Sequence, residues 1–198
     1  VTEPGYHPVK LSVSNGSHSM EFVQEKVIEA IGEETCVLFN GSTGCLKVPA
    51  NPAMLLTDAF TFEAWIMPTD RGNDRGVHLR KVFDKSAASL TFVDVHPAKN
   101  DKALYLAIKF EDGTTGHFYT PENSIAFDEW QHIAVSFGIN GVFMFINGVQ
   151  QEVETSSSIG GNLVDNADNN LVIGASINET SSKFDGRIDE IRLWSIAR

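Results

Sequence analysis

The chain has 198 residues, of which 42% are hydrophobic and 21% are charged, so it can bury a substantial core and resembles neither a disordered segment nor a membrane span. Asp and Glu outnumber Lys and Arg by 26 to 15, and the net charge of -11 argues against nucleic acid or an anionic membrane as a partner. The longest apolar run, residues 142–146, is too short for a transmembrane helix, and two cysteines cannot form a disulfide scaffold or a four-cysteine zinc site.

The first 35 residues contain the one stretch that does not look like a strand. Residues 1–9 favour an extended arm because they contain prolines and a glycine. Residues 20–31 are rich in helix formers and predict a short helix, which Ser19 would cap and Gly32 would end. The apolar residues at helical spacing are Val23, Val27, Ile28 and Ile31. A pair of strands is the alternative that this segment leaves open.

Most of the remaining chain alternates apolar and polar residues with a period of two, which is typical of β-strands. The expected strands include residues 60–67, 104–110, 132–137, 142–146 and 188–194. Long amphipathic helices, which a parallel α/β fold needs between its strands, are missing. The last strand is expected to place Ile191 and Leu193 on one face, and Ile188, Glu190, Arg192 and Trp194 on the other.

Five Asx-Gly pairs separate the apolar runs, and such pairs tolerate the positive φ of tight hairpin turns. They are Asn40-Gly41, Asp112-Gly113, Asn140-Gly141, Asn147-Gly148 and Asp185-Gly186. The sequence therefore predicts an all-β fold of many antiparallel strands. No internal repeat and no clear linker divides the chain, so residues 1–198 are expected to form one domain.

A set of ordered segments links the chain to a known family. The segments are Cys36-Val-Leu-Phe-Asn-Gly, Leu46-Lys-Val-Pro, Ala59-Phe-Thr-Phe-Glu-Ala-Trp-Ile-Met-Pro, Trp130-Gln-His-Ile-Ala-Val-Ser-Phe, Val142-Phe-Met-Phe-Ile-Asn-Gly-Val, Leu171-Val-Ile-Gly and Phe184-Asp-Gly-Arg-Ile-Asp-Glu-Ile-Arg-Leu-Trp. In this order they resemble the concanavalin A-like lectin/glucanase superfamily, in its laminin-G-like, pentraxin-like branch. The resemblance covers residues 36–198 and leaves residues 1–35 as an N-terminal extension.

The resemblance implies a jelly roll, in which two antiparallel sheets pack face to face. The period-two alternation leads to the same sandwich independently, because each strand hides one face and exposes the other. By resemblance, Trp65, Trp130 and Trp194 are expected to pack between the sheets.

The two cysteines are candidates for a disulfide bond. If Asn40-Gly41 is a two-residue hairpin loop, Cys36 faces Cys45 in a non-hydrogen-bonded pair, where Cα atoms are about 4.5 Å apart and a disulfide fits. Such a bond would indicate an oxidising compartment. Two half-buried free thiols are the alternative.

Calcium is the cofactor that the sequence suggests, because the chain is acidic and rich in oxygen ligands. The resemblance implies a structural calcium where the first and last strands meet, with Asp189 as the side-chain ligand and the carbonyls of Asn40 and Gly41 as partners. A hydrogen-bonded Asp189 without metal is the alternative. Two further Asp- and Asn-rich stretches, residues 70–74 and 165–170, are weaker candidates, because such stretches are more often solvated loops.

A carbohydrate site needs an aromatic platform and planar polar groups, and two regions offer them. Tyr105 and Tyr119 lie on strands that could line one sheet, although ordinary cross-strand packing explains them as well. The loop at residues 70–75 adds Asp70, Arg71, Asn73, Asp74 and Arg75. These seven residues are the predicted ligand-binding set.

Catalysis is not expected. The superfamily's glucanases carry carboxylates spaced Glu-x-Asp-x-x-Glu on one strand, and this chain has no such run. The predicted function is therefore a non-catalytic, lectin-like module of a secreted or cell-surface protein, cut from a larger multidomain chain. One alternative is a protein-interaction or spacer domain without a glycan ligand, and a second is a glycoside hydrolase-like jelly roll.

Overall fold

The computed structural model describes residues 5–14, 19–30, 36–71, 78–95, 100–155 and 160–198. The chain divides into two compact units, Val1–Cys36 and Val37–Arg198. Within the described ranges, the only helical element is the short 3-10 helix η1 (Pro52–Met54), and no helix is long and apolar enough to cross a membrane.

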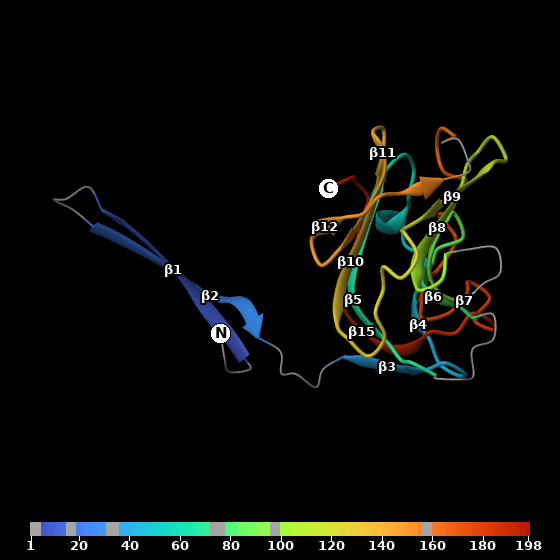
Figure 1. Ribbon diagram of the computed structural model, residues 1–198. Coiled ribbons are helices and arrows are strands. Elements are labelled where there is room, and N and C mark those ends of the chain that lie inside the picture. The colour runs from blue at the N-terminus through green and yellow to red at the C-terminus, as the bar shows by residue number, and fades with distance from the viewer. Residues whose placement is uncertain (1–4, 15–18, 31–35, 72–77, 96–99, 156–159) are drawn as a thin grey trace. The chain divides into compact units, whose positions relative to one another are not determined.

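The first unit is a pair of antiparallel strands, β1 (Gly5–Ser14) and β2 (Ser19–Ala30) (Figure 1). The helix predicted over residues 20–31 is therefore wrong, and the strand-pair alternative is the one that forms. The preceding segment explains this result, because its apolar residues at positions 9, 11 and 13 alternate with period two and give β2 a partner strand. Pairing with a neighbour overrides a weak intrinsic preference for helix.

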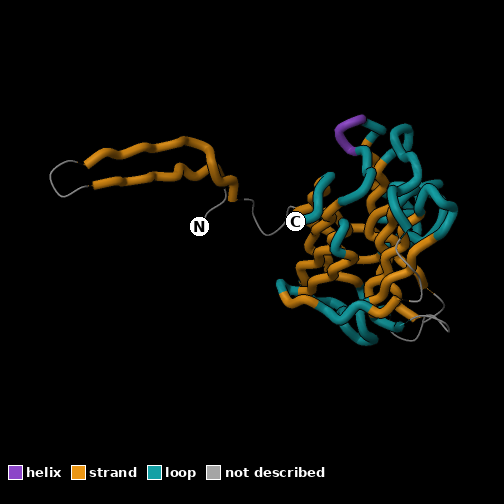
Figure 2. Tube along the Cα trace, turned by 90° about the horizontal axis from the view of Figure 1, so that it is seen from above, coloured by secondary structure: helices purple, strands orange, loops and turns teal. Residues whose placement is uncertain are grey.

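The second unit contains two antiparallel sheets (Figure 1). The six-stranded sheet has the spatial order β12 (Val149–Gln150), β11 (Gly141–Ile146), β10 (Gln131–Gly138), β5 (Phe60–Pro68), β15 (Asp185–Trp194) and β3 (Val37–Asn40). The seven-stranded sheet has the order β13 (Glu154–Thr155), β9 (Thr115–Tyr119), β8 (Ala103–Lys109), β7 (Ala88–Val95), β6 (His78–Asp84), β14 (Leu171–Ile173) and β4 (Leu46–Val48). Figure 2 shows the strands in the middle of this unit and most of the loops around them. The all-β jelly-roll prediction is confirmed.

Phenylalanine rings from both sheets form the centre of the sandwich. Phe62 of β5 lies 4.3 Å from Phe83 of β6, measured between ring centroids, and Phe60 lies 6.4 Å from the same ring. Phe137 of β10 packs against Phe60 at 5.9 Å and against Phe110 at 5.9 Å. All of these rings are buried, and each contributes about 1.5–3 kcal/mol by leaving water. These contacts hold the two sheets face to face.

Three of the five Asx-Gly pairs lie at hairpin turns, as predicted. They connect β8 to β9, β10 to β11, and β11 to β12. Asp185-Gly186 instead lies inside β15. Asn40-Gly41 ends β3 without a hairpin, because β3 pairs with β15 in one sheet while β4 pairs with β14 in the other.

A β-bulge in β15 changes which of its residues face the core. Asp189 pairs with Trp65, but the next paired residue is Arg192 with Glu63, so β15 has one extra residue there. Glu190 within the bulge has a φ of 47°. Ile188 before the bulge is therefore buried, and Ile191 and Leu193 after it also pack against the core. The predicted separation of Ile188 from Ile191 and Leu193 onto opposite faces is wrong, because a bulge shifts the alternation by one residue.

Substitution of Gly186 tests how tightly β15 packs against β5. Its φ is 135°, and an added Cβ would lie 2.2 Å from the carbonyl oxygen of Met67. We expect Gly186→Ala to lower the free energy of unfolding by about 3 kcal/mol or more, because backbone strain and a steric clash combine. Urea denaturation followed by circular dichroism measures this loss.

The matched control is Gly113→Ala. Gly113 also has a positive φ, 83°, but an added Cβ there meets no atom within 4 Å. Gly113→Ala should therefore lower the free energy of unfolding by only about 1–2 kcal/mol, which is the cost of a left-handed backbone conformation for alanine. Equal losses in the two variants would contradict the steric explanation.

Candidate functional site

The first candidate site is an aromatic cluster on the outer face of the seven-stranded sheet. Burial alternates along β8 and β9, so Leu106 and Phe118 face the core while Tyr105, His117 and Tyr119 face outward and are half-buried. The rings of Tyr105 and Tyr119 stack with centroids 4.7 Å apart and an interplanar angle of 11°. The structure therefore brings the two predicted tyrosines together.

His117 also belongs to this cluster, although it is not in the predicted ligand-binding set. Its ring lies 5.8 Å from that of Tyr105, and its Nδ1 is 2.6 Å from the Tyr105 hydroxyl. Since it lies two residues before Tyr119 on β9, the period-two pattern alone places it on the same face. Burial, followed by the neighbouring phenol of Tyr119, raises the pKa of Tyr105 to about 12.

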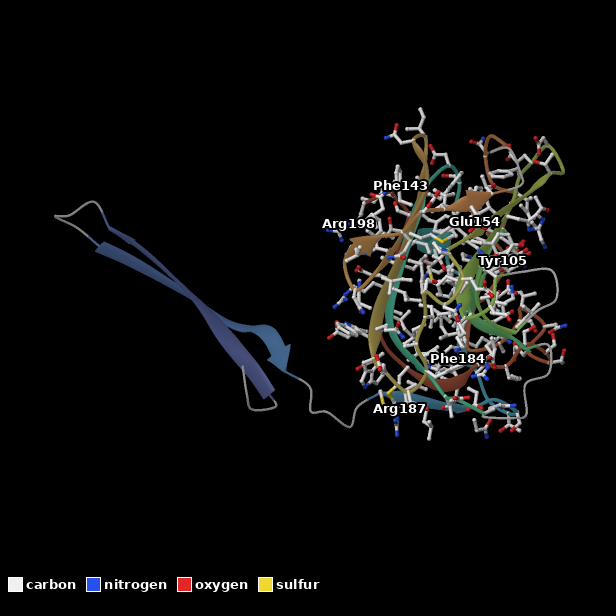
Figure 3. The ribbon with its side chains drawn as sticks, viewed as in Figure 1. Tyr105, Phe143, Glu154, Phe184, Arg187 and Arg198 are labelled. Atoms are coloured by element: carbon white, nitrogen blue, oxygen red, sulfur yellow. The ribbon has the colours of Figure 1, made fainter. Side chains whose placement is uncertain are left out.

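Polar residues extend the aromatic cluster across the sheet. Strand register places Glu154 of β13 beside Tyr119, Thr91 of β7 beside Tyr105, and Lys81 of β6 beside Thr91. Neighbouring strands are about 4.8 Å apart, so these residues form one row of five across five strands. In Figure 3, Tyr105 and Glu154 lie in the part of the unit formed by the seven-stranded sheet. Thr91 is buried, and the ammonium group of Lys81 donates to Ser89 Oγ at 2.6 Å. The stacked aromatic pair can contact the apolar face of a sugar, and the carboxylate of Glu154 beside it can accept hydrogen bonds from sugar hydroxyls.

The second candidate site is a cleft of about 470 Å³ at one end of the sandwich. It lies between the turn after β3, the residue Arg71 after β5, the start of β6, and the loop before β15. Its polar lining consists of Ser42, Arg71, Arg80, Thr180, Ser181, Ser182 and Lys183. Of the two predicted loop residues that the structure describes, Asp70 and Arg71, only Arg71 lines this cleft.

Two arginines of the cleft are held by ion pairs. The Nε of Arg71 donates to Asp185 Oδ2 at 2.5 Å, and Arg80 donates to Asp94 Oδ2 at 2.5 Å while also bonding the carbonyl of Thr69. Arg80 and Asp94 are buried, and burial lowers the pKa of Arg80 while the charge of Asp94 opposes that change. These bonds hold Arg80 in place as a buried residue of the cleft lining.

Of the other predicted loop residues, the structure describes Asp70 alone. Asp70 follows β5, and its backbone N–H donates to Asp128 Oδ1 over 3.4 Å. Asn73, Asp74 and Arg75 lie outside the described residues.

The predicted calcium ligands do not come together. Asn40 pairs with Asp185 on β15, whereas Asp189 lies four residues further along the strand, a distance of about 13 Å. Asn40 Oδ1 accepts hydrogen bonds from Ser42 and Thr43, and Asp189 Oδ1 accepts one from the backbone N–H of Glu190. Within the described residues, no group of three or more His, Cys, Asp or Glu side chains could hold a metal ion. Binding of calcium by this chain stays a prediction.

The side chain of Lys85 lies within the other acidic stretch, residues 165–170. Lys85 is completely buried, and its Nζ donates to the backbone carbonyls of Asn166 and Asn169 at 3.2 and 3.0 Å. Burial lowers the pKa of this lysine. Asn166 is also buried and bonds both backbone groups of Leu56. Hydrogen bonds from Lys85 and to Leu56 thus hold residues 165–170 in place.

The two cysteines are free thiols, each half-buried. The hairpin register that would place Cys36 opposite Cys45 is absent, because β3 and β4 pair with different strands in different sheets. The disulfide prediction depended on that register, so its geometric basis is wrong.

The tryptophans lie on the outside of the six-stranded sheet and not in the core. Trp65 and Trp130 are 38% and 39% exposed, and Trp194 is half-buried. The core prediction for these residues is wrong because Ala64 and Ile66 take the inward positions of β5. Glu63 is at the centre of this face, where it accepts a hydrogen bond from Trp194 Nε1 at 3.3 Å and lies 3.7 Å from His132.

The sequence of this chain matches a known protein family. The sequence profile described as the concanavalin A-like lectin/glucanases superfamily matches residues 40–198. The chain belongs to this superfamily. The predicted resemblance is therefore confirmed. A comparison with curated proteins finds no match.

Solved structures of the superfamily fold include three informative neighbours. Domain 4 of AbnA, an extracellular GH43 arabinanase from Geobacillus stearothermophilus solved with arabinotriose, has a TM-score of 0.57 and 19% identity over 85% of this chain and 74% of its own. Mouse laminin α1 domains LG4-5 have a TM-score of 0.60 and 11% identity over 88% of this chain and 46% of their own. The CBM40 of Ruminococcus gnavus IT-sialidase, bound to α2,3 sialyllactose, has a TM-score of 0.53 and 10% identity over 77% of this chain and 92% of its own. At these identities the likeness shows the fold alone.

The raised pKa of Tyr105 predicts a specific loss of stability at high pH. The folded state favours the neutral phenol, so this contribution is complete below about pH 10, the pKa of an unfolded tyrosine, and is lost as pH rises toward 12. Calorimetric melting between pH 9 and 12 should therefore show a shallower decline for Tyr105→Phe than for the wild type. Parallel declines would show that burial of the Tyr105 phenol has no such effect.

The free thiols predict that reductant leaves the fold unchanged. We expect the melting temperature to be the same with and without dithiothreitol, because no covalent bond links Cys36 to Cys45. Mass spectrometry after native alkylation should show two adducts per chain, since both thiols are partly exposed. A single species without adducts, which becomes reactive only after reduction, would establish a disulfide instead.

Proposed function

We propose that this chain is a non-catalytic carbohydrate-binding module. The superfamily match supports this proposal at the level of the fold. Two neighbours of the same fold were solved with sugars, arabinotriose for the arabinanase domain and α2,3 sialyllactose for the sialidase module. The arabinanase is extracellular and its domain 4 is one part of a larger enzyme, which supports a secreted or cell-surface setting and a larger parent chain for this module as well.

The aromatic cluster on the seven-stranded sheet is the observation that carries the proposal. Tyr105, Tyr119 and His117 form one contiguous aromatic surface, and Glu154 and Lys81 stand at the two ends of the row that contains both tyrosines. Strands fix the spacing of all five residues, so the surface exists before a ligand arrives. A preformed surface loses little conformational entropy on binding, which suits the recognition of flexible sugar chains.

The cleft supports a binding role over a catalytic one. Glycoside hydrolysis uses two carboxyl groups about 5–10 Å apart on either side of the scissile bond. The described residues that line the cleft include arginines, a lysine and hydroxyls but no Asp or Glu. This lining can hold a sugar, but it lacks the acid and base that would cleave one.

A protein-interaction module is the second candidate, and one observation favours it. Four large apolar side chains are exposed on the outer face of the six-stranded sheet: Trp65, Trp130, Phe143 and Leu38. Large apolar side chains that cluster at a surface often mark interaction sites. Figure 3 shows Phe143 toward the side of the six-stranded sheet, away from Tyr105. The two candidate functions therefore use different faces and can be tested separately.

Aromatic substitutions on the two faces distinguish these candidates. We expect Tyr119→Ala and Tyr105→Ala to weaken glycan binding at least about tenfold, equivalent to about 1.4 kcal/mol, because each removes half of the stacked pair. A glycan array followed by titration calorimetry of the strongest hits measures the change. Phe143→Ala, an exposed aromatic on the other sheet, is the matched control and should bind like the wild type.

The opposite pattern would support the second candidate. A silent array, together with association with another extracellular protein that Phe143→Ala abolishes and Tyr119→Ala leaves intact, would contradict the carbohydrate proposal. Repeating the array and a thermal melt with calcium and with a chelator tests the predicted cofactor in the same experiment.

A further inference from the structure

We infer that the cleft at Arg71 binds the carboxylate of an acidic sugar, so that the glycan recognised by this module is a uronate or another carboxylated chain. The inference rests on the proposed function and narrows it to a class of ligand. The volume, the charge, the hydroxyl lining and the rigidity of the cleft each support it.

The charge of the cleft runs against that of the whole chain. The protein carries a net charge of -11, yet the described residues that line this cleft include three cations, Arg71, Arg80 and Lys183, and no carboxylate. Asp185 and Asp94 neutralise the two arginines from behind the lining, and Lys183 remains, with a carbonyl contact to Gly44 at 3.3 Å. An acidic protein that collects cations in its cleft provides a local site for an anion.

Arg71 is positioned to present its guanidinium to the cleft. Asp185 binds its Nε, and a Cβ added to Gly41 would lie 1.8 Å from its Nη2, so the guanidinium lies directly over the backbone of that glycine. Gly41, with a φ of 70°, leaves the space that this arrangement needs. A planar guanidinium held along one side can offer its other N–H groups to a planar carboxylate, which is the partner that matches its geometry best.

The rest of the lining matches a sugar better than a bare anion. The cleft volume of about 470 Å³ lies within the range of about 300–1,000 Å³ that is typical of small-molecule sites. Thr180 and Ser182 are among the residues that line it, and each has a side-chain hydroxyl. Hydroxyls that both donate and accept can pair with the hydroxyls of a sugar ring, while Leu79 supplies an apolar contact.

Backbone hydrogen bonds join the segments around the cleft. The N–H of Lys81 donates to the carbonyl of Ser182 at 2.8 Å, and the N–H of Gly41 donates to that of Phe184 at 2.9 Å. Within the loop before β15, Ser176 and Ser181 bond each other through both backbone and side chains. These described segments are therefore held in place before a ligand binds.

Methyl esterification provides a test of the carboxylate. An array of carboxylated oligosaccharides, including oligogalacturonate, is compared with the methyl esters of the same chains and with a carrageenan oligosaccharide that carries sulfate but no carboxylate. We expect binding of at least one carboxylated chain and a loss of at least about tenfold on esterification, because the ester removes the charge that the guanidinium pairs with. Raising the salt concentration should weaken binding of the acid form more than that of the ester.

Two variants locate the binding in the cleft. Lys183→Gln should weaken binding of the carboxylated chain about fivefold, and Ser42→Asp, which adds a negative charge to the exposed rim of the lining, at least about tenfold. Lys109→Gln is the control, because it removes the same single charge from an exposed position on β8 that does not line the cleft, and it should change binding less than about twofold. Circular dichroism of each variant confirms the fold.

Several outcomes would overturn the inference while leaving the proposed function intact. These are equal binding of acid and ester, a preference for the sulfated chain, or binding that Tyr119→Ala abolishes but Lys183→Gln and Ser42→Asp do not change. Binding of neutral glycans alone would also overturn the inference and leave the proposed function intact. No binding on an array that holds neutral, carboxylated and sulfated glycans would remove both the inference and the proposed function.

Discussion

The packing of phenylalanine rings between the two sheets is the constraint on which the rest of the structure depends. Because Phe60, Phe62 and Phe83 fill the interior, each strand has one face committed to the core, and only the outer faces and the ends of the sandwich are available for binding. Both candidate sites follow from this division. The tyrosine row occupies an outer face, and the cleft lies where turns and loops meet at one end.

Much of the fold was predictable from the sequence, because a period-two pattern is a local property. The alternation around Leu106 and the hairpin at Asn140-Gly141 needed no knowledge of distant residues. The errors arose where the pattern was interrupted or where the partner strand was unknown. A bulge at Glu190 shifts the faces of β15, and β2 becomes a strand because β1 is beside it.

The candidate site was only partly predictable, for a similar reason. Tyr105 and Tyr119 were identified because strand alternation placed both on exposed faces, and the structure adds that they are direct cross-strand partners. The cleft was not visible, since its lining residues come from three regions that are far apart in the sequence, near residues 41, 71 and 181. The same limit affected the stretch at residues 165–170, where composition suggested a metal ion but the ammonium group of Lys85 lies beside two backbone carbonyl oxygens.

Lys85 also affects how the loop at residues 165–170 depends on the concentration of metal ions around the protein. Its ammonium group is covalently part of the chain, so the loop at residues 165–170 keeps its central positive charge whatever the mineral content of the surroundings. A lectin whose loops close around a dissociable ion loses its shape when that ion is sequestered or diluted. Because a covalently bound ammonium group already holds this stretch together, we expect its geometry to persist in soft water, in hard water and in the presence of strong chelators alike.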